Sequence, residues 1–263
     1  GAVSAIIMGS SDTVSEEKGA EKEQEHQRLQ AILDQKRLDK APWVGVLCGP
    51  GNNGGDGVAA ARILMGMGCR VRAFLVGDRS KMTPDERAME EKLKEAGGAL
   101  EAYLPLDREQ SFWLAQCDCL VDALFGVGLS RPVEGDFLYA VREMRDRPHF
   151  RRVVSCDIPS GVHADTGEVL GEAVHAGVTV TFTCAKPGHY LGDGAEHTGK
   201  LRVYDIGIPD ELQYGREDRI QVETMDAGLS LPHRKPNSHK GDYGKLFLLA
   251  GSEGYTGAPV LAA

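Results

Sequence analysis

Three segments of the chain place polar side chains and glycines directly after a short apolar run. The longest is GPGNNGGDG at residues 49–57, which follows the apolar residues 43–48. Asp122 leads into GVGLSRP at 126–132, and Asp157 leads into IPSG at 158–161. One such aspartate alone would be expected to cap the segment that follows it. If the apolar runs are parallel strands, however, all three segments lie at the carboxyl edge of the sheet, where α/β proteins bind ligands. The sequence therefore predicts one polar pocket.

The first of these segments fits the pattern GxGxxG, which is typical of dinucleotide-binding loops. Asp56 stands where the next helix is expected to begin, over residues 57–67, and its carboxylate would then cap the helix amides in place of a diphosphate. Asn52 and Asn53 add side-chain amides that such loops usually lack. The segment is therefore predicted to bind a polar ligand, a cation or both, and the absence of GK[ST] excludes a P-loop.

Asn53, Asp122 and Ser160 are oxygen donors, which suit a hard cation better than zinc or copper. Because only one of them is a carboxylate, a weakly charged ion is favoured over a divalent one. Lys186, in AKPG, is a second candidate for acid–base chemistry or ligand binding, and a solvated lysine before a turn is the alternative.

The elements that must position these residues alternate regularly along the chain. Apolar runs predict strands, and amphipathic stretches between them predict helices. This alternation predicts an α/β fold, a Rossmann-like three-layer αβα sandwich with a mostly parallel central sheet. Strands are expected at 43–48, 70–76, 100–104, 119–123, 152–156, 178–184 and 201–206, and helices at 57–67, 84–96, 108–116 and 136–146. Thr83 to Glu86 forms the pattern of a capping box.

Outside this core, residues 14–41 predict a charged helix with a narrow apolar stripe at Leu29, Ile32 and Leu33. Residues 232–241 are polar and basic and predict an interdomain linker. The predicted organisation is a domain over 1–230, followed at 231–263 by the linker and the first strand and helix start of a second domain.

Composition excludes several classes of protein. Of the 263 residues 41% are apolar and 26% are charged, as in soluble globular proteins. The net charge of −9 argues against binding to nucleic acid. No apolar run approaches the ~18 residues of a membrane span. Six cysteines without a CxxC pair predict reduced thiols and a cytoplasmic location.

Six motifs in unbroken order give the chain a resemblance to a known family. They are GPGNNGGDG (49–57), VDALFGVGL (121–129), DIPSG (157–161), DTGEVLG (165–171), TVTFTCAKPG (179–188) and DIGIP (205–209). Over roughly residues 43–210 the chain resembles the NAD(P)H-hydrate epimerases, the YjeF N-terminal domain family. Residues 238–263 resemble the start of the ribokinase-like, ADP-dependent NAD(P)H-hydrate dehydratase domain. The resemblance thus implies a bifunctional parent, with no dehydratase activity expected from these 263 residues.

The resemblance also implies roles for particular residues. The small-molecule substrate would be the hydrated cofactor NAD(P)HX, the cofactor ion would be K⁺, and the assembly would be a homo-oligomer. Asn53, Asp122 and Ser160 match the potassium ligands. The family's substrate-binding positions correspond in this chain to Asn52, Asn53, Gly54, Gly55, Asp56, Gly126, Val127, Gly128, Leu129, Ser130, Arg131, Pro132 and Asp157.

The implied reaction interconverts the R and S hydrates at C6 of the reduced nicotinamide ring. That carbon is a hemiaminal, so loss of its hydroxyl group requires a proton donor. Asp157 is the candidate, with Lys186 next. Some proteins of this fold are non-catalytic nucleotide-binding or scaffold modules, and that alternative stays open. The non-catalytic alternative is favoured by Met8–Asp12, which stands where the family has Met-Glu-Asn-Ala-Gly. The enzyme is favoured by the presence of Asn53, Asp122 and Asp157.

Overall fold

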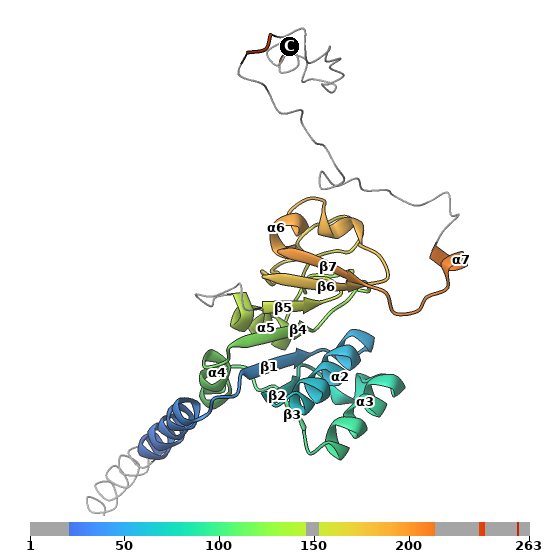
Figure 1. Ribbon diagram of the computed structural model, residues 1–263. Coiled ribbons are helices and arrows are strands. Elements are labelled where there is room, and N and C mark those ends of the chain that lie inside the picture. The colour runs from blue at the N-terminus through green and yellow to red at the C-terminus, as the bar shows by residue number, and fades with distance from the viewer. Residues whose placement is uncertain (1–20, 146–152, 214–236, 240–256, 258–263) are drawn as a thin grey trace, which may run out of the picture. The chain divides into compact units, whose positions relative to one another are not determined.

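One seven-stranded sheet forms the centre of the protein. The computed structural model describes residues 21–145, 153–213, 237–239 and 257. All neighbouring strands of the sheet are parallel, in the order β3-β2-β1-β4-β5-β6-β7 (Figure 1). The strands are β1 (Trp43–Cys48), β2 (Arg70–Leu75), β3 (Leu100–Ala102), β4 (Cys119–Ala123), β5 (Val153–Cys156), β6 (Val178–Phe182) and β7 (Lys200–Tyr204).

Helices cover both faces of this sheet, and each face has its own apolar core. The longer helices are α2 (Asn52–Gly66), α3 (Pro84–Glu95), α4 (Arg108–Ala115) and α5 (Asp136–Arg145). In β1, Trp43 and Leu47 join the core that contains the apolar residues of α4 and α5. Val46 and Cys48 point the other way, into the core shared with α2 and α3. The predicted three-layer αβα sandwich is therefore confirmed.

Shorter elements follow β2 and β6 and close the described part of the chain. They are the 3-10 helices η1 (Arg79–Lys81) and η3 (Pro187–His189) and the helices α6 (Gly194–Thr198) and α7 (Asp210–Gln213).

Most predicted boundaries agree with the structure to within two residues, and β1 and β4 agree completely. β6 ends at Phe182 rather than at residue 184, because Thr183 has a φ of +64°, which is incompatible with a strand. Thr83 caps α3 as predicted, since its Oγ1 accepts a hydrogen bond from the Glu86 amide at 3.2 Å. The Glu86 carboxyl group also accepts a hydrogen bond from the amide of Gly51 at 2.8 Å, which the capping-box pattern does not predict.

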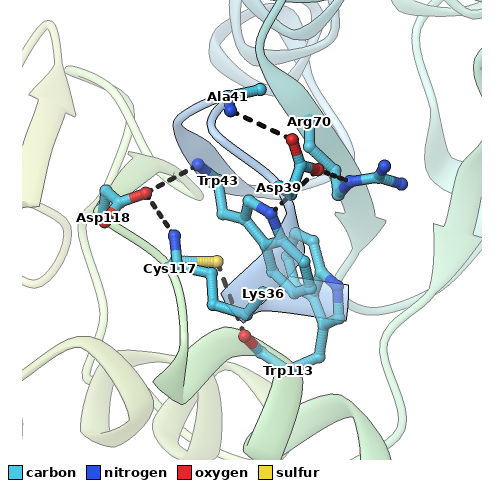
Figure 2. Close-up of polar contacts among 8 residues, drawn as sticks. All are labelled: Lys36, Asp39, Ala41, Trp43, Arg70, Trp113, Cys117 and Asp118. Carbon is cyan, nitrogen blue, oxygen red and sulfur yellow. Dashed lines mark hydrogen bonds and ion pairs between the residues drawn. The ribbon is translucent and has the colours of Figure 1, made fainter. Parts of the chain in front are cut away.

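The predicted charged helix is attached at the amino ends of the strands. Residues 21–38 are helical, and Leu29, Ile32 and Leu33 are its half-buried apolar residues. Lys36 donates at 2.5 Å to Asp118, which also accepts a hydrogen bond from the backbone amide of Trp43 at 2.8 Å (Figure 2).

The indole of Trp43 completes this junction. Its Nε1 donates to Asp39 at 3.3 Å, Asp39 is ion-paired with Arg70, and the ring stacks on Trp113 at 5.3 Å (Figure 2). Trp43 and Arg70 begin β1 and β2. The helix is therefore anchored at the amino ends of the strands, away from their carboxyl ends.

Two other predictions concern the chain beyond this core. Contacts divide the chain into residues 1–216 and 217–263. Of the predicted linker and second domain, the structure describes only residues 237–239 and 257, and Met8–Asp12 lies outside the described residues, so these assignments stay predictions. Among the described helices, none has both the length and the apolar character required to cross a membrane. The six cysteines all lie among the described residues, and none of them forms a disulfide bond.

Candidate active site

A cavity of about 730 Å³ opens at the carboxyl ends of β1, β4 and β5. After β1 the chain continues to β2 on one side of β1, whereas β4 lies on the other side of β1. The connections therefore diverge between β1 and β4. Such a switch point is where open α/β sheets bind ligands. The lining residues come from the three predicted loops: Pro50, Gly51, Asn52, Asn53 and Asp56, then Leu124–Arg131, and Asp157, with Thr83 from the start of α3.

Glycines in the first loop allow the backbone to pack closely. A Cβ atom at Gly49 would lie 2.0 Å from the carbonyl oxygen of Leu124, and one at Gly54 would lie 1.8 Å from that of Gly49. A Cβ at Gly57 would lie 2.5 Å from the Cβ of Ala123. Since real Cβ atoms do not approach other atoms this closely, these glycines let α2 pack directly against β1 and β4.

The predicted start of α2 is wrong. The helix begins at Asn52, with Gly51 as the N-cap, and Asp56 lies in its second turn. Asp56 therefore does not cap the helix, and the described residues place no acidic side chain in its first turn. The first-turn amides of α2 lie beside the cavity, as an anionic ligand requires.

The three predicted cation ligands differ in their surroundings. Asp122 is fully buried, and its carboxyl group accepts hydrogen bonds from both the Oγ (2.5 Å) and the amide (2.8 Å) of Ser160 and from the Oγ of Ser155 (2.7 Å). Burial raises the pKa of Asp122, and these hydrogen bonds act in the opposite direction. The amide oxygen and nitrogen of Asn53 are buried without a hydrogen-bond partner.

Asp157 and Lys186 are in direct contact. The Lys186 Nζ donates to Asp157 Oδ1 at 2.5 Å, to Thr181 Oγ1 at 2.7 Å and to the Phe182 carbonyl at 3.1 Å. Thr181 also donates to Asp157 Oδ1, at 2.9 Å. Asp157 lines the cavity and Lys186 does not. The lysine is therefore a neighbour that holds Asp157.

The backbone of Asp157 is held in an unusual conformation. Its φ is +65°, in the left-handed region that aspartate tolerates better than most residues. His189 lies with its Nε2 at 2.9 Å from the Asp157 carbonyl, and its Nδ1 accepts from the Lys186 amide at 3.0 Å. Since Nδ1 accepts, Nε2 carries the proton and donates. Burial lowers the pKa of His189, which favours this neutral ring.

Asp56 is the other carboxyl group at the cavity. Its pKa is raised, first by partial removal from water and then by the negative charge of Asp157. The negative charge of Asp157 therefore acts on Asp56 within the same cavity.

Not every predicted binding residue faces this cavity. Gly54 and Gly55 are buried behind it, and Pro132 lines an adjoining hollow of about 460 Å³. That hollow shares Phe125, Leu129 and Arg131 with the main cavity.

The sequence did not predict that Thr83 lines the cavity, nor that Thr181 and His189 hold Asp157. A signal existed for Thr181, because a polar residue at an inward position of the strand 178–182 needs a polar partner.

Comparisons with known proteins identify the family of the chain. Residues 26–188 match the model of the family described as YjeF-related protein N-terminus. The chain is 46% identical over 220 residues to the bifunctional NAD(P)H-hydrate repair enzyme Nnr of Thermofilum pendens, covering 82% of this chain and 40% of that protein. It is 40% identical over 171 residues to the NAD(P)H-hydrate epimerase of Weissella koreensis, covering 64% of this chain and 72% of that protein.

A solved structure supports the fold alone. The crystal structure of yeast YNL200c is similar with a TM-score of 0.54 at 24% identity, covering 76% of this chain and 84% of that one. The chain spans about 40% of the length of the bifunctional relatives named Nnr. From the family match and the Weissella koreensis relative, the chain belongs to the family of YjeF-related protein N-terminal domains.

Proposed function

We propose that this chain interconverts the R and S forms of NAD(P)H hydrate and so takes part in repair of the nicotinamide cofactor. The name of the Weissella koreensis relative supports this activity. The observation that carries the proposal is the cavity at the switch point, where a glycine-rich helix start faces the carboxyl groups of Asp56 and Asp157. Such a cavity would bring a polar nucleotide and a proton donor to one place.

The reaction needs one proton to move twice. Protonation of the C6 hydroxyl group lets the C–O bond break and water leave, while the lone pair of the ring nitrogen forms a C=N bond. Water then adds to C6 from the other face, and its proton returns to the carboxylate. This sequence consumes nothing and inverts C6.

We assign the proton transfer to Asp157. Its Oδ1 is held by Lys186 and Thr181, which leaves Oδ2 for the substrate. Asp56 is the second candidate, because its raised pKa favours the protonated form that a donor requires.

The two adjoining hollows suit an elongated ligand. Phe125, Leu129 and Arg131 border both of them, so one dinucleotide could extend from the carboxyl groups toward Pro132. Arg131 is the positively charged side chain in this lining, and its guanidinium group would bind a phosphate group.

We also propose K⁺ as the cofactor ion, held by Asn53, Asp122 and Ser160. The buried, unpartnered amide oxygen of Asn53 and the buried carboxyl group of Asp122 fit a cation site. Asp122 is the single carboxyl group in this set, and one negative charge suits a monovalent ion better than a divalent one. Such an ion would offset the cost of burying Asp122 and stabilise the loops around it.

The direct test is epimer exchange. A purified single epimer of NADHX is incubated with the protein, and both epimers are followed by chromatography. We expect exchange well above the spontaneous rate. A rate equal to that in buffer, with NADHX still bound, would favour the non-catalytic nucleotide-binding alternative.

A further inference from the structure

Glu86 is a buried carboxyl group beneath the glycine-rich loop. Glu86 lies in the first turn of α3 and is 0% exposed to solvent. Its Oε2 accepts a hydrogen bond from the Gly51 amide at 2.8 Å. Gly51 is the N-cap of α2, 35 residues away in sequence. This bond therefore connects the start of α3 to the start of α2.

The start of α2 is packed tightly against Glu86. A Cβ at Gly54 would lie 2.8 Å from Glu86 Oε1, and a Cβ at Gly55 would lie 3.3 Å from Glu86 Cα. Oε1 is buried and has no hydrogen-bond partner. A buried carboxylate oxygen without a partner is costly when it is charged, so this site resists ionisation.

The surroundings of Glu86 place its ionisation near neutral pH. Its pKa is raised to about 7, mainly by burial, whereas the amide hydrogen bonds and Arg87 lower it and Glu90 raises it. On the neighbouring strand β1, Cys48 is the titratable group whose pKa is raised in part by the charge of Glu86. The residues of α2 packed against it are the uncharged Gly54 and Gly55.

We propose that Glu86 is a positioning residue whose charge state controls the start of α2, and with it Asn52, Asn53 and Asp56 at the cavity. When Glu86 is neutral, the turn packs closely on it. When it is ionised, Oε1 requires water or a donor, and the turn must move away to admit one. The consequence for substrate rests on the proposed function: ionisation loosens the turn and weakens binding of an anionic nucleotide.

The structural part is tested without substrate. In ¹⁵N-labelled full chain, we expect the Gly51 amide resonance to shift between pH 5.5 and 8.5 with a midpoint near 7. In Glu86→Gln the shift should disappear, because the amide oxygen still accepts from Gly51 but does not titrate. Glu91→Gln is the matched control, an exposed carboxyl group on the same helix, and should titrate like the parent.

Two results would overturn the proposal. One is a Gly51 resonance that does not change with pH in the parent, and the other is a titration that persists in Glu86→Gln. If that variant does not fold, the ¹³C resonance of the Glu86 carboxyl carbon in the parent decides, since a midpoint below 5.5 excludes a switch at neutral pH.

The functional part uses epimer exchange at pH 6 and pH 8. We expect KM for NADHX to rise three- to tenfold with pH in the parent and to stay constant in Glu86→Gln, with kcat similar in both. A pH-dependent KM in Glu86→Gln would contradict the role of Glu86 in binding. If the parent shows no exchange at all, the proposed function fails. The titration of the Gly51 amide still tests whether the charge of Glu86 controls the start of α2.

Discussion

Replacing Asp157 by asparagine separates proton transfer from substrate binding. The variant keeps the shape of the side chain and an oxygen that can accept from Lys186 and Thr181, but it removes the charge and the exchangeable proton. Loss of general acid–base catalysis lowers turnover by about 10²–10⁴. At 1.36 kcal/mol per factor of ten, this is about 2.7–5.4 kcal/mol in the barrier.

The stability of the variant should fall by less. Breaking a fully buried ion pair costs about 3–5 kcal/mol. Here the side chains of Asp157 and Lys186 are 13% and 16% exposed, and the Nζ keeps its bonds to Thr181 and Phe182. We therefore expect a loss of about 1.5–2 kcal/mol, the lower part of the range for a hydrogen bond to a charged group.

The assay is epimer exchange at saturating NADHX, with the dissociation constant measured separately by calorimetry. We expect a dissociation constant within about threefold of the parent. Asp85→Asn, an exposed carboxyl group at the start of α3, is the control and should leave both values unchanged. Turnover near the parent rate in Asp157→Asn would refute the assignment and direct attention to Asp56.

Three further predictions concern the fold around the site. Gly57→Ala should destabilise the protein by about 1–3 kcal/mol through overpacking against β4, whereas Gly66→Ala, which meets no atom within 4 Å, should stabilise it by about 0.5–1 kcal/mol in chemical denaturation. The thermal midpoint should be higher in KCl than in LiCl at equal ionic strength, and Ser160→Ala should reduce that difference. Because burial lowers the pKa of His189 below 6.5, the unfolded state binds more protons below that pH, so the free energy of unfolding should fall from pH 7 to pH 5, and less steeply in His189→Gln.

The sequence predicted the parts of the fold that depend on local pattern. β1 is an apolar run ended by a polar glycine-rich loop, and β4 is a short apolar run that includes Asp122 near its end. The bounds of both strands follow from these local patterns. The start of α2 did not follow, because asparagine and glycine have low helix propensity. The structure makes residues 52–57 helical because Gly57 lets α2 approach Ala123, which is a tertiary effect.

Contacts between distant residues were the other limit. Thr83 and Glu86 have the spacing of a capping box, and only the structure shows that the Glu86 carboxyl group binds Gly51. Asp157 and Lys186 were both candidates from their positions after apolar runs. Their ion pair spans 29 residues, so it depends on the pairing of β5 with β6.

The central claim is that the cavity at the switch point binds and epimerises NAD(P)H hydrate, and filling that cavity tests it most directly. Gly128 lines the cavity, and Gly66 ends α2 away from it. A Cβ at either glycine would meet no atom within 4 Å. Both Gly128→Phe and Gly66→Phe should therefore fold. Epimer exchange of NADHX should fall at least a hundredfold in Gly128→Phe and stay within about twofold of the parent in Gly66→Phe. Equal exchange rates in the two folded variants would contradict the assignment of the active site to this cavity.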